Sequence, residues 1–173
     1  MVKSINIKKC DITTLDIDII VNAANKTLLG GGGVDGQIHR KAGRELLEEC
    51  KTLHGCETGE AKMTGAYNLP CKKVIHTVGP VYRDGLHNES DLLRNCYENS
   101  LKLAESYRKE NNLDEVTIAF PCISTGIYGY PMEEASIIVI DVLKKSQYND
   151  INVILSCFSD RDYDTYNKLL KSV

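Results

Sequence analysis

The sequence lacks the features that place a chain in or across a membrane. No apolar run approaches the roughly eighteen residues that a membrane-spanning helix needs, and the first residues do not have the pattern of a signal peptide. Tryptophan is absent, while hydrophobic residues make up 42% and charged residues 26% of the chain. These fractions are ordinary for globular proteins, so disorder is not indicated. We therefore expect a folded cytoplasmic protein with no membrane partner.

An excess of basic residues is also missing. The 21 lysines and arginines are outnumbered by 24 aspartates and glutamates, the net charge is -3, and both signs are spread along the chain. Because no basic stripe is available, we expect no nucleic acid partner. An anionic ligand has to be held by local geometry rather than by the overall field.

The cysteines follow neither a disulfide pattern nor a zinc pattern. There are seven, an odd number without regular spacing, which predicts a reducing cytoplasm rather than a disulfide framework. Cys50, His54, Cys56 and Cys71 could be assembled into a zinc site only on paper, because no C-x-x-C pair is present. We therefore expect no metal and no cofactor.

Four familiar catalytic or phosphate-binding motifs fail in context. Gly31–Gly36 formally matches the dinucleotide motif G-x-G-x-x-G, but several residues separate it from the preceding strand and an aspartate lies inside it. A Walker loop needs Gly-Lys-Ser/Thr, which does not follow here. Beside Cys122, Tyr128 stands where a phosphatase loop requires arginine, and Ser124 lacks the flanks of a nucleophile elbow. Nicotinamide, ATPase, cysteine phosphatase and serine hydrolase chemistry are therefore not indicated.

Apolar periodicity predicts one α/β domain over residues 1–173. Strands alternate with helices after the first segment, which indicates a largely parallel sheet with helices on both faces. The first strand alternates polar and apolar residues, so we expect it near a sheet edge, and Gly43 is placed to divide the first helix. The predicted strands are 4–8, 16–23, 61–66, 73–78, 116–120 and 151–156, the predicted helices are 34–52, 91–110, 132–145 and 162–171, and 82–90 is a predicted surface loop.

The chain is organised around residues 19–40. A buried strand leads into Asn22 and Asn25, and four consecutive glycines, Gly30–Gly33, precede a helix. Glycine permits positive φ and a close approach of ligand to backbone, and the helix directs its N-terminus to the same place, so the stretch predicts an anion cradle. Asp35 is the anomaly, since its carboxylate would repel a bound phosphate, and this indicates a chemical role. The alternative, a solvated loop followed by a helix-start acid, leaves the flanking apolar residues unexplained.

A second glycine-bearing loop, residues 121–131, lies between the strand 116–120 and the next helix. Ligands of open α/β sheets bind beyond the carboxyl ends of the strands. Both glycine loops are predicted at such ends. We therefore expect them to face one another across one crevice.

Two further polar residues each permit two interpretations. Asp11 either caps the turn after the first strand or accepts a hydrogen bond from a ligand amine at that place. His39 lies one helical turn after Asp35 on the same face. It either orients a substrate or a water, or it is a packed or solvated helical histidine.

The motifs Val21–Asn25, Gly30–Gly36 and Ile123–Pro131 resemble those of the macro domain family and, within it, the MacroD-type ADP-ribosyl hydrolases. This resemblance implies a three-layer α/β/α sandwich around a mixed six-stranded sheet, with ADP-ribose bound in its crest. One departure is Cys10, where related sequences usually carry glycine. The likeness covers nearly the whole chain and extends to Thr58–Ala61, Asn68–Pro70 and Val74–Pro80.

The resemblance also implies how a ligand is held. Asp11 would bind the adenine amino group beside the Ile12 backbone, and Phe158 would stack on the adenine. Backbone N–H groups of both loops would hold the pyrophosphate. The implied pyrophosphate residues are Gly32, Gly33, Val34, Ser124, Thr125, Gly126, Ile127 and Tyr128.

At the distal ribose, the resemblance implies the chemistry. Asn25 would hydrogen-bond this ribose with Asn22 as support, Tyr128 would form its wall, and Asp35 would orient or deprotonate a water. We add His39 to these catalytic candidates because of its helical spacing to Asp35, not because of the resemblance. The implied partners are ADP-ribose, O-acetyl-ADP-ribose and proteins mono-ADP-ribosylated on Glu or Asp. Water would attack either the ester carbonyl or the anomeric carbon.

Two functions remain open at this point. The first is a hydrolase of these esters, and the second is a reader that binds ADP-ribose without cleaving it, since one fold hosts both. A carboxylate beside phosphates favours the enzyme, because a reader gains nothing from it. We also expect a monomer, and the composition in lysine, asparagine and isoleucine suggests a bacterial source.

Overall fold

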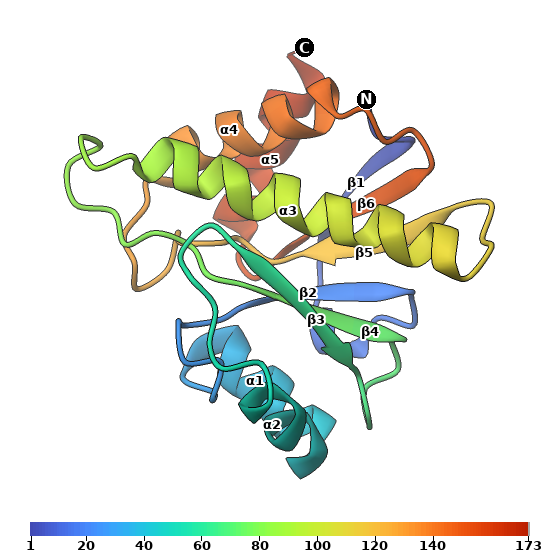
Figure 1. Cartoon of the computed structure of the whole chain (residues 1–173). Coiled ribbons are helices and arrows are strands. Elements are labelled where there is room, and N and C mark those ends of the chain that lie inside the picture. Colours follow the sequence, from blue (N-terminus) through green and yellow to red (C-terminus); the bar gives the residue numbers. More distant parts are fainter. Residues whose placement is uncertain (173) are drawn as a thin grey trace.

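The computed structural model describes residues 1–172 as three layers, a six-stranded sheet between two groups of helices (Figure 1). The order of the strands across the sheet is β1-β6-β5-β2-β4-β3. The strands are β1 (Ser4–Lys9), β2 (Ile19–Ala23), β3 (Ala61–Gly65), β4 (Lys73–Thr77), β5 (Val116–Phe120) and β6 (Ile151–Cys157). The helices are the 3-10 helix η1 (Ile12–Thr14), α1 (Gly33–Ala42), α2 (Arg44–Lys51), α3 (Glu89–Glu110), α4 (Met132–Lys145) and α5 (Asp160–Lys171).

The sheet is mixed but mostly parallel, as the sequence predicts. Every neighbouring pair is parallel except β3 and β4, which run antiparallel at one edge. Strand β1 forms the other edge, which confirms its predicted place. Since five of the six strands share one direction, their carboxyl ends meet along one side of the sheet.

Alternating side chains of the central strands divide the interior into two cores. In β2, Ile19 and Val21 pack in one hydrophobic cluster with α3, α4 and α5, while Ile20 packs in a second cluster with α1 and α2. In β5, Ile118 and Ala119 divide in the same way. Figure 1 shows the two helix groups on opposite sides of the sheet. A strand with two buried faces reads as a continuous apolar run, which is why the alternation is invisible in the sequence.

The predicted helix over residues 34–52 is divided at Gly43. This glycine has a φ of 94°, ends α1 and begins α2. Positive φ strains residues with a side chain, so glycine is the residue that permits this corner. The predicted division is confirmed, and it leaves α1 as a short helix whose first turn faces the carboxyl ends of the strands.

Helix α3 begins at Glu89, so residues 89 and 90 do not belong to the predicted surface loop. The side chain of Glu89 is only 1% exposed, because its carboxylate holds the preceding loop together. Hydrogen bonds from the backbone, that of Arg83 first, lower the pKa of this carboxyl to about 2. The backbone N–H groups of Arg83, Asp84, Gly85 and His87 donate to its two oxygens.

Helix α5 also starts before its predicted first residue, at Asp160 rather than at residue 162. The Ser159 hydroxyl accepts a hydrogen bond from the Asp162 N–H at 3.1 Å and thereby caps the first turn. Serine is a favoured capping residue, and its place ahead of a first turn that carries Asp160 and Asp162 is the signal in the sequence.

The structure contains no disulfide bond among residues 1–172. All seven are free thiols in the structure. Within residues 1–172, no helix combines the length and the apolar character needed to cross a membrane.

Candidate functional site

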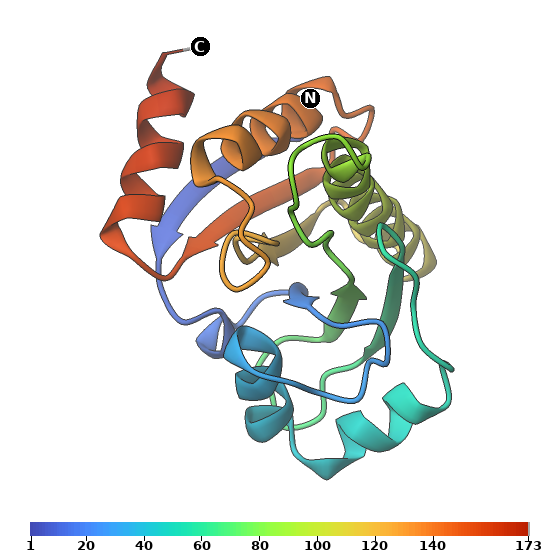
Figure 2. The same cartoon turned by 90° about the vertical axis from the view of Figure 1, so that its left-hand side faces the viewer.

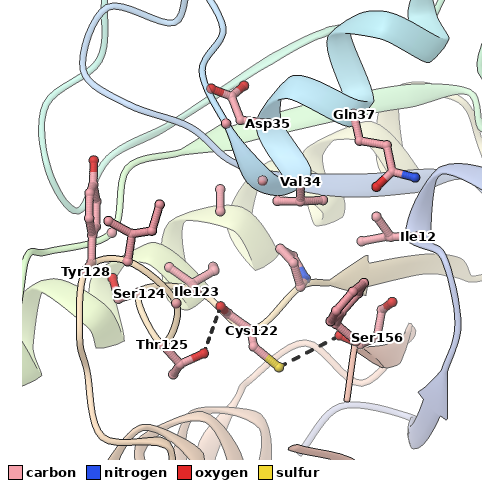
Figure 3. Close-up of a pocket in the computed structure, with 18 of the residues that line it drawn as sticks. Ile12, Val34, Asp35, Gln37, Cys122, Ile123, Ser124, Thr125, Tyr128 and Ser156 are labelled. Atoms are coloured by element: carbon pink, nitrogen blue, oxygen red, sulfur yellow. Dashed lines mark hydrogen bonds between the residues drawn. The ribbon is translucent and has the colours of Figure 1, made fainter.

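A cavity of about 870 Å³ opens at the carboxyl ends of the parallel strands. Its walls come from the segments that follow β1, β2, β4, β5 and β6. Figure 2 views the ribbon from the side where these segments leave the parallel strands. The two glycine loops lie on opposite sides of it, with Val34 and Asp35 at the start of α1 across from Ser124 and Thr125 (Figure 3). The prediction that both loops face one crevice is therefore confirmed.

Most of the predicted site residues line this cavity. Asn22 and His39 do not, because they lie behind Asp35, away from the open space. The predicted residues that line it are Asp11, Ile12, Asn25, Gly32, Gly33, Val34, Asp35, Ser124, Thr125, Gly126, Ile127, Tyr128 and Phe158.

The first glycine loop presents bare backbone at the start of α1. Gly33 has a φ of 58° and opens the helix, and nothing lies within 4 Å of the position that a side chain would take there. The loop is supported from inside by Gly36, whose own N–H donates to the Gly32 carbonyl at 3.3 Å. Unpaired N–H groups at the helix start and an open approach are what an anion requires.

The second loop is held in a conformation that exposes its own backbone. Ser124 has a φ of 67°, and its carbonyl accepts a hydrogen bond from the Tyr130 N–H at 2.9 Å. The Thr125 hydroxyl donates to the Cys122 carbonyl at 3.2 Å (Figure 3). The Ser124 hydroxyl is buried and has no partner within residues 1–172, so it is free to serve a ligand.

Gly79 is a lining residue that sequence reasoning missed. A methyl group added there would lie 2.2 Å from the Ser124 Oγ and 2.6 Å from the Ile123 Cγ2. The absence of a side chain after β4 thus makes room for the second loop. Because Gly79 and Ser124 are far apart in sequence, only the fold reveals the contact.

Asp35 is almost completely buried, with 4% of its surface exposed. Its Oδ1 accepts a hydrogen bond from the Asn22 Nδ2 at 2.8 Å and lies 3.5 Å from the His39 Nε2. Burial raises the pKa of this carboxyl above its usual range, although the bond from Asn22 and the nearby His39 oppose the rise. A carboxyl with a raised pKa accepts and returns protons more readily near neutral pH.

The second oxygen of Asp35 and the side-chain amide of Asn25 both lie next to Gly31. A methyl group added at Gly31 would lie 3.2 Å from the Asp35 Oδ2 and 3.3 Å from the Asn25 Nδ2, so the carboxylate and the amide flank one point of the cavity. Asn25 also donates to the Gly30 carbonyl and accepts from the Thr27 N–H, which fixes its side chain. Asp35 and Asn25 therefore form a rigid pair at one end of the cavity.

Asp11 caps the turn and also lines the opposite end of the cavity. Its Oδ1 accepts from the Thr13 N–H at 3.0 Å and from the Thr13 hydroxyl at 2.6 Å. These bonds, that of the hydroxyl first, lower the pKa of the carboxyl. Its Oδ2 accepts from the Gln37 Nε2 at 2.9 Å. The capping interpretation is confirmed, and Gln37, one turn after Gly33 on the cavity face of α1, was missed.

Two exposed apolar side chains stand at the rim. Phe158, just after β6, is 93% exposed, and Ile127 in the second loop is 97% exposed. Both line the cavity. Large apolar side chains left in water beside a cavity are typical of a surface that a ligand covers.

The remaining reactive groups do not form a second catalytic centre. Cys122 lines the cavity and is half-buried, and hydrogen bonding to Cys157 and burial raise the pKa of its thiol, which keeps it protonated. Outside the cavity, Asp84, His87 and Glu89 are the one group with metal-ligand spacing in the described part of the chain. Four backbone N–H groups already donate to the Glu89 carboxylate, so this cluster stabilises the loop before α3 rather than offering free metal ligands.

This chain matches the family model of the Macro domain over residues 21–139. It is 56% identical over 165 residues to a macro domain-containing protein of Chlorobaculum tepidum. The aligned region covers 94% of this chain and 92% of that protein. It is 50% identical over 175 residues to the ADP-ribose glycohydrolase MACROD2 of Homo sapiens, which covers 97% of this chain but 39% of that protein.

Solved structures share its fold. The Oceanobacillus iheyensis macrodomain with ADP superimposes with a TM-score of 0.87 at 41% identity, over 96% of this chain and 89% of that one. The Trypanosoma brucei macrodomain in complex with ADP-ribose gives a TM-score of 0.80 at 43% identity, over 96% of this chain and 68% of that one.

Proposed function

Because the chain belongs to the macro domain family, we propose that its cavity binds ADP-ribose and that Asp35 directs a water onto an ester at the distal ribose. The substrates are proteins mono-ADP-ribosylated on glutamate or aspartate, and O-acetyl-ADP-ribose. We propose further that the chain acts as one domain. The similarity to a human ADP-ribose glycohydrolase and to a macrodomain in complex with ADP-ribose supports this proposal.

The single observation that carries the hydrolase proposal is the state of Asp35. This carboxylate is buried, its pKa is raised, and its Oδ2 and the Asn25 amide lie next to Gly31 in the wall of the cavity. A protein that only binds phosphates has no use for such a group, because it repels them. A general base needs it, since proton transfer works best when the pKa approaches the working pH.

The dimensions of the cavity accommodate an elongated dinucleotide-like ligand. In our proposal, adenine lies between Asp11 and Phe158, and the backbone N–H groups of the two loops take the pyrophosphate. The distal ribose then reaches Asn25 and Asp35 at the other end. Lys9 is the one basic residue among those that line the cavity, and its Nζ donates to the Asp160 carboxylate at 2.8 Å. In our proposal the backbone N–H groups and the helix N-terminus therefore hold the diphosphate.

The chemistry adds one water across the ester. Asp35 Oδ2 takes a proton from the water, the resulting hydroxide attacks, and the C–O bond of the ester breaks. Asp35 then returns its proton to the oxygen that the broken C–O bond releases, and the products are free ADP-ribose and a carboxylic acid. General-base assistance of this kind is worth about 10²–10⁴-fold in rate.

The direct test is to incubate the protein with a substrate ADP-ribosylated on glutamate and to follow the release of labelled ADP-ribose. We expect release by catalytic amounts of protein. If the protein binds ADP-ribose but releases no label, it is a reader and the hydrolase proposal is wrong.

The adenine position is tested by replacing Phe158 with alanine. Loss of stacking and apolar contact is expected to weaken ADP-ribose binding by about 1–2 kcal/mol, or roughly 5–30-fold in Kd. The melting temperature is expected to stay unchanged, because the ring is 93% exposed in the free protein. Isothermal titration calorimetry measures the affinity.

The matched control is Ile137→Ala, which removes an exposed apolar side chain of α4 that does not line the cavity. This variant is expected to bind ADP-ribose as tightly as the wild type. Equal affinities for Phe158→Ala and Ile137→Ala would mean that adenine binds elsewhere.

A further inference from the structure

Behind Asp35, a chain of buried hydrogen bonds crosses three strands of the sheet. The Asn22 Nδ2 lies 2.8 Å from the Asp35 Oδ1 and 3.1 Å from the His76 Nδ1. The His76 Nε2 lies 2.9 Å from the Thr64 Oγ1, which in turn donates to the Gly65 carbonyl at 3.0 Å. Asn22 and His76 are fully buried, and Thr64 is 2% exposed. Of the residues joined by these hydrogen bonds, Asp35 lines the cavity, and Asn22, His76 and Thr64 do not.

The fold dictates this chain of contacts. Asn22 on β2 and His76 on β4 are register partners in the parallel sheet. Thr64 lies on β3, which pairs antiparallel with β4. The three side chains therefore share one face of the sheet, the face on which α1 places Asp35.

The last hydrogen bond, from Thr64 to the Gly65 carbonyl, fixes which group donates and which accepts in the other bonds. A backbone carbonyl only accepts, so the Thr64 hydroxyl donates its hydrogen to the Gly65 carbonyl and accepts a hydrogen bond from His76. The His76 Nε2 must then carry the ring proton, and Nδ1 is left as an acceptor for Asn22. Both N–H bonds of the Asn22 amide are thereby used, one toward His76 and one toward Asp35.

The surroundings of His76 keep its ring neutral. Burial lowers its pKa to about 3, and the nearby His39 adds to this effect. The ring faces Asn22, Thr64, the Cys50 thiol at 3.9 Å and the His39 ring at 6.4 Å. Since burial raises the thiol pKa of Cys50 to about 11, this neighbour keeps its own proton near neutral pH.

The two ends of an amide have nearly the same shape, so packing alone does not orient Asn22. With the amide turned over, its oxygen would face the Asp35 carboxylate and repel it. We propose that His76 is a positioning residue for the reaction: through Asn22 it ties down Oδ1 of Asp35 and leaves Oδ2 to the water. This inference rests on the proposed hydrolase function. Thr64 acts one step further back, by fixing the tautomer of His76.

Two substitutions separate this role from simple packing. In His76→Asn, the side-chain oxygen is as many bonds from Cα as Nδ1, so it keeps an acceptor for Asn22. In His76→Gln, the polar end reaches the place of Nε2 and keeps only the contact with Thr64. Positioning therefore predicts that asparagine retains turnover close to wild type, whereas glutamine lowers kcat about tenfold with the Kd for ADP-ribose unchanged.

A merely structural role predicts the reverse order, because glutamine fills more of the space of histidine than asparagine does. Turnover, Kd and melting temperature are measured together on the wild type and both variants. If turnover in the two variants follows their melting temperatures, with asparagine the worse, the positioning role is wrong.

The tautomer supplies a readout that does not depend on activity. Nitrogen NMR of the wild type with ¹⁵N-labelled histidine is expected to show His76 neutral, with the proton on Nε2, down to about pH 5. A proton on Nδ1 would overturn the inference. If the wild type releases no ADP-ribose, the proposed function fails and the positioning role falls with it; normal wild-type release with the reversed order of variants contradicts the positioning role alone.

Discussion

Asp35→Asn is expected to lose turnover by about 10²–10⁴-fold while ADP-ribose binding stays close to wild type. Asparagine has the shape of aspartate and keeps an oxygen for the Asn22 Nδ2, but it does not accept a proton from water. The lost interaction therefore belongs to the transition state rather than to the bound ligand. Single-turnover release from a glutamate-linked substrate gives the rate, and calorimetry gives the affinity.

The same variant is expected to be at least as stable as the wild type at neutral pH. Burial raises the pKa of Asp35 in the folded protein, so ionising this carboxyl costs stability as the pH rises from its ordinary value of 3.8 through the raised one. Asparagine does not titrate and avoids that cost. The gain in melting temperature should shrink on acidification, because both proteins are neutral at this site below pH 3.8.

Asp16→Asn is the matched control, since it makes the same chemical change at an exposed site that does not line the cavity. It should retain full turnover. If Asp35→Asn retains wild-type turnover, Asp35 is not the base and the hydrolase mechanism is wrong.

Gly36→Ala is expected to lower kcat/KM by about 10²-fold, the loss that a misplacement of roughly 1 Å causes at a catalytic centre. A methyl group at Gly36 would lie 2.4 Å from the Gly31 carbonyl oxygen, and a backbone atom has to move to relieve this overlap. Gly31 lies between Asn25 and Asp35, so the shift displaces the glycine loop from the catalytic pair. ADP-ribose affinity should fall as well, because the same loop supplies N–H groups.

Local helix propensity makes the opposite prediction for this variant. Alanine inside a helix is favoured over glycine by about 1 kcal/mol, so a substitution without overlap would raise the melting temperature. The overlap instead predicts a fall of about 1–3 kcal/mol in the free energy of unfolding. A more stable variant with unchanged kcat/KM would show that the contact between Gly36 and Gly31 does not hold the loop.

Much of the architecture follows from the sequence, because the central strands are short apolar runs, the helices have apolar residues at helical spacing, and glycine or proline interrupts the pattern between them. Strand β1, with alternating residues, was placed at an edge, and Gly43 was placed at a break in the helix. Both features are local. The position of the two glycine loops at one cavity followed from a general property of parallel sheets, that ligands lie beyond the carboxyl ends of the strands.

What the sequence did not reveal depends on contacts between distant segments. His76 lies 54 residues from Asn22, and only strand register makes them neighbours. Gly79 has to be glycine because the Ser124 side chain lies against it, and Glu89 is buried because it accepts hydrogen bonds from the loop before α3. Neither contact is visible in the local sequence. A polar residue in an apolar strand was the one available signal for His76, but its partners were not specified by any local pattern. The roles of the predicted ligand and catalytic residues stay predictions until a ligand is seen.

The most direct test of the account is a crystal structure of the wild-type protein with ADP-ribose. We predict the pyrophosphate against the backbone of both glycine loops, adenine beside Asp11 and Phe158, and a water between the Asp35 Oδ2 and the distal ribose. A structure in which the distal ribose lies away from Asp35, or in which no space for a water remains between them, would contradict the central claim.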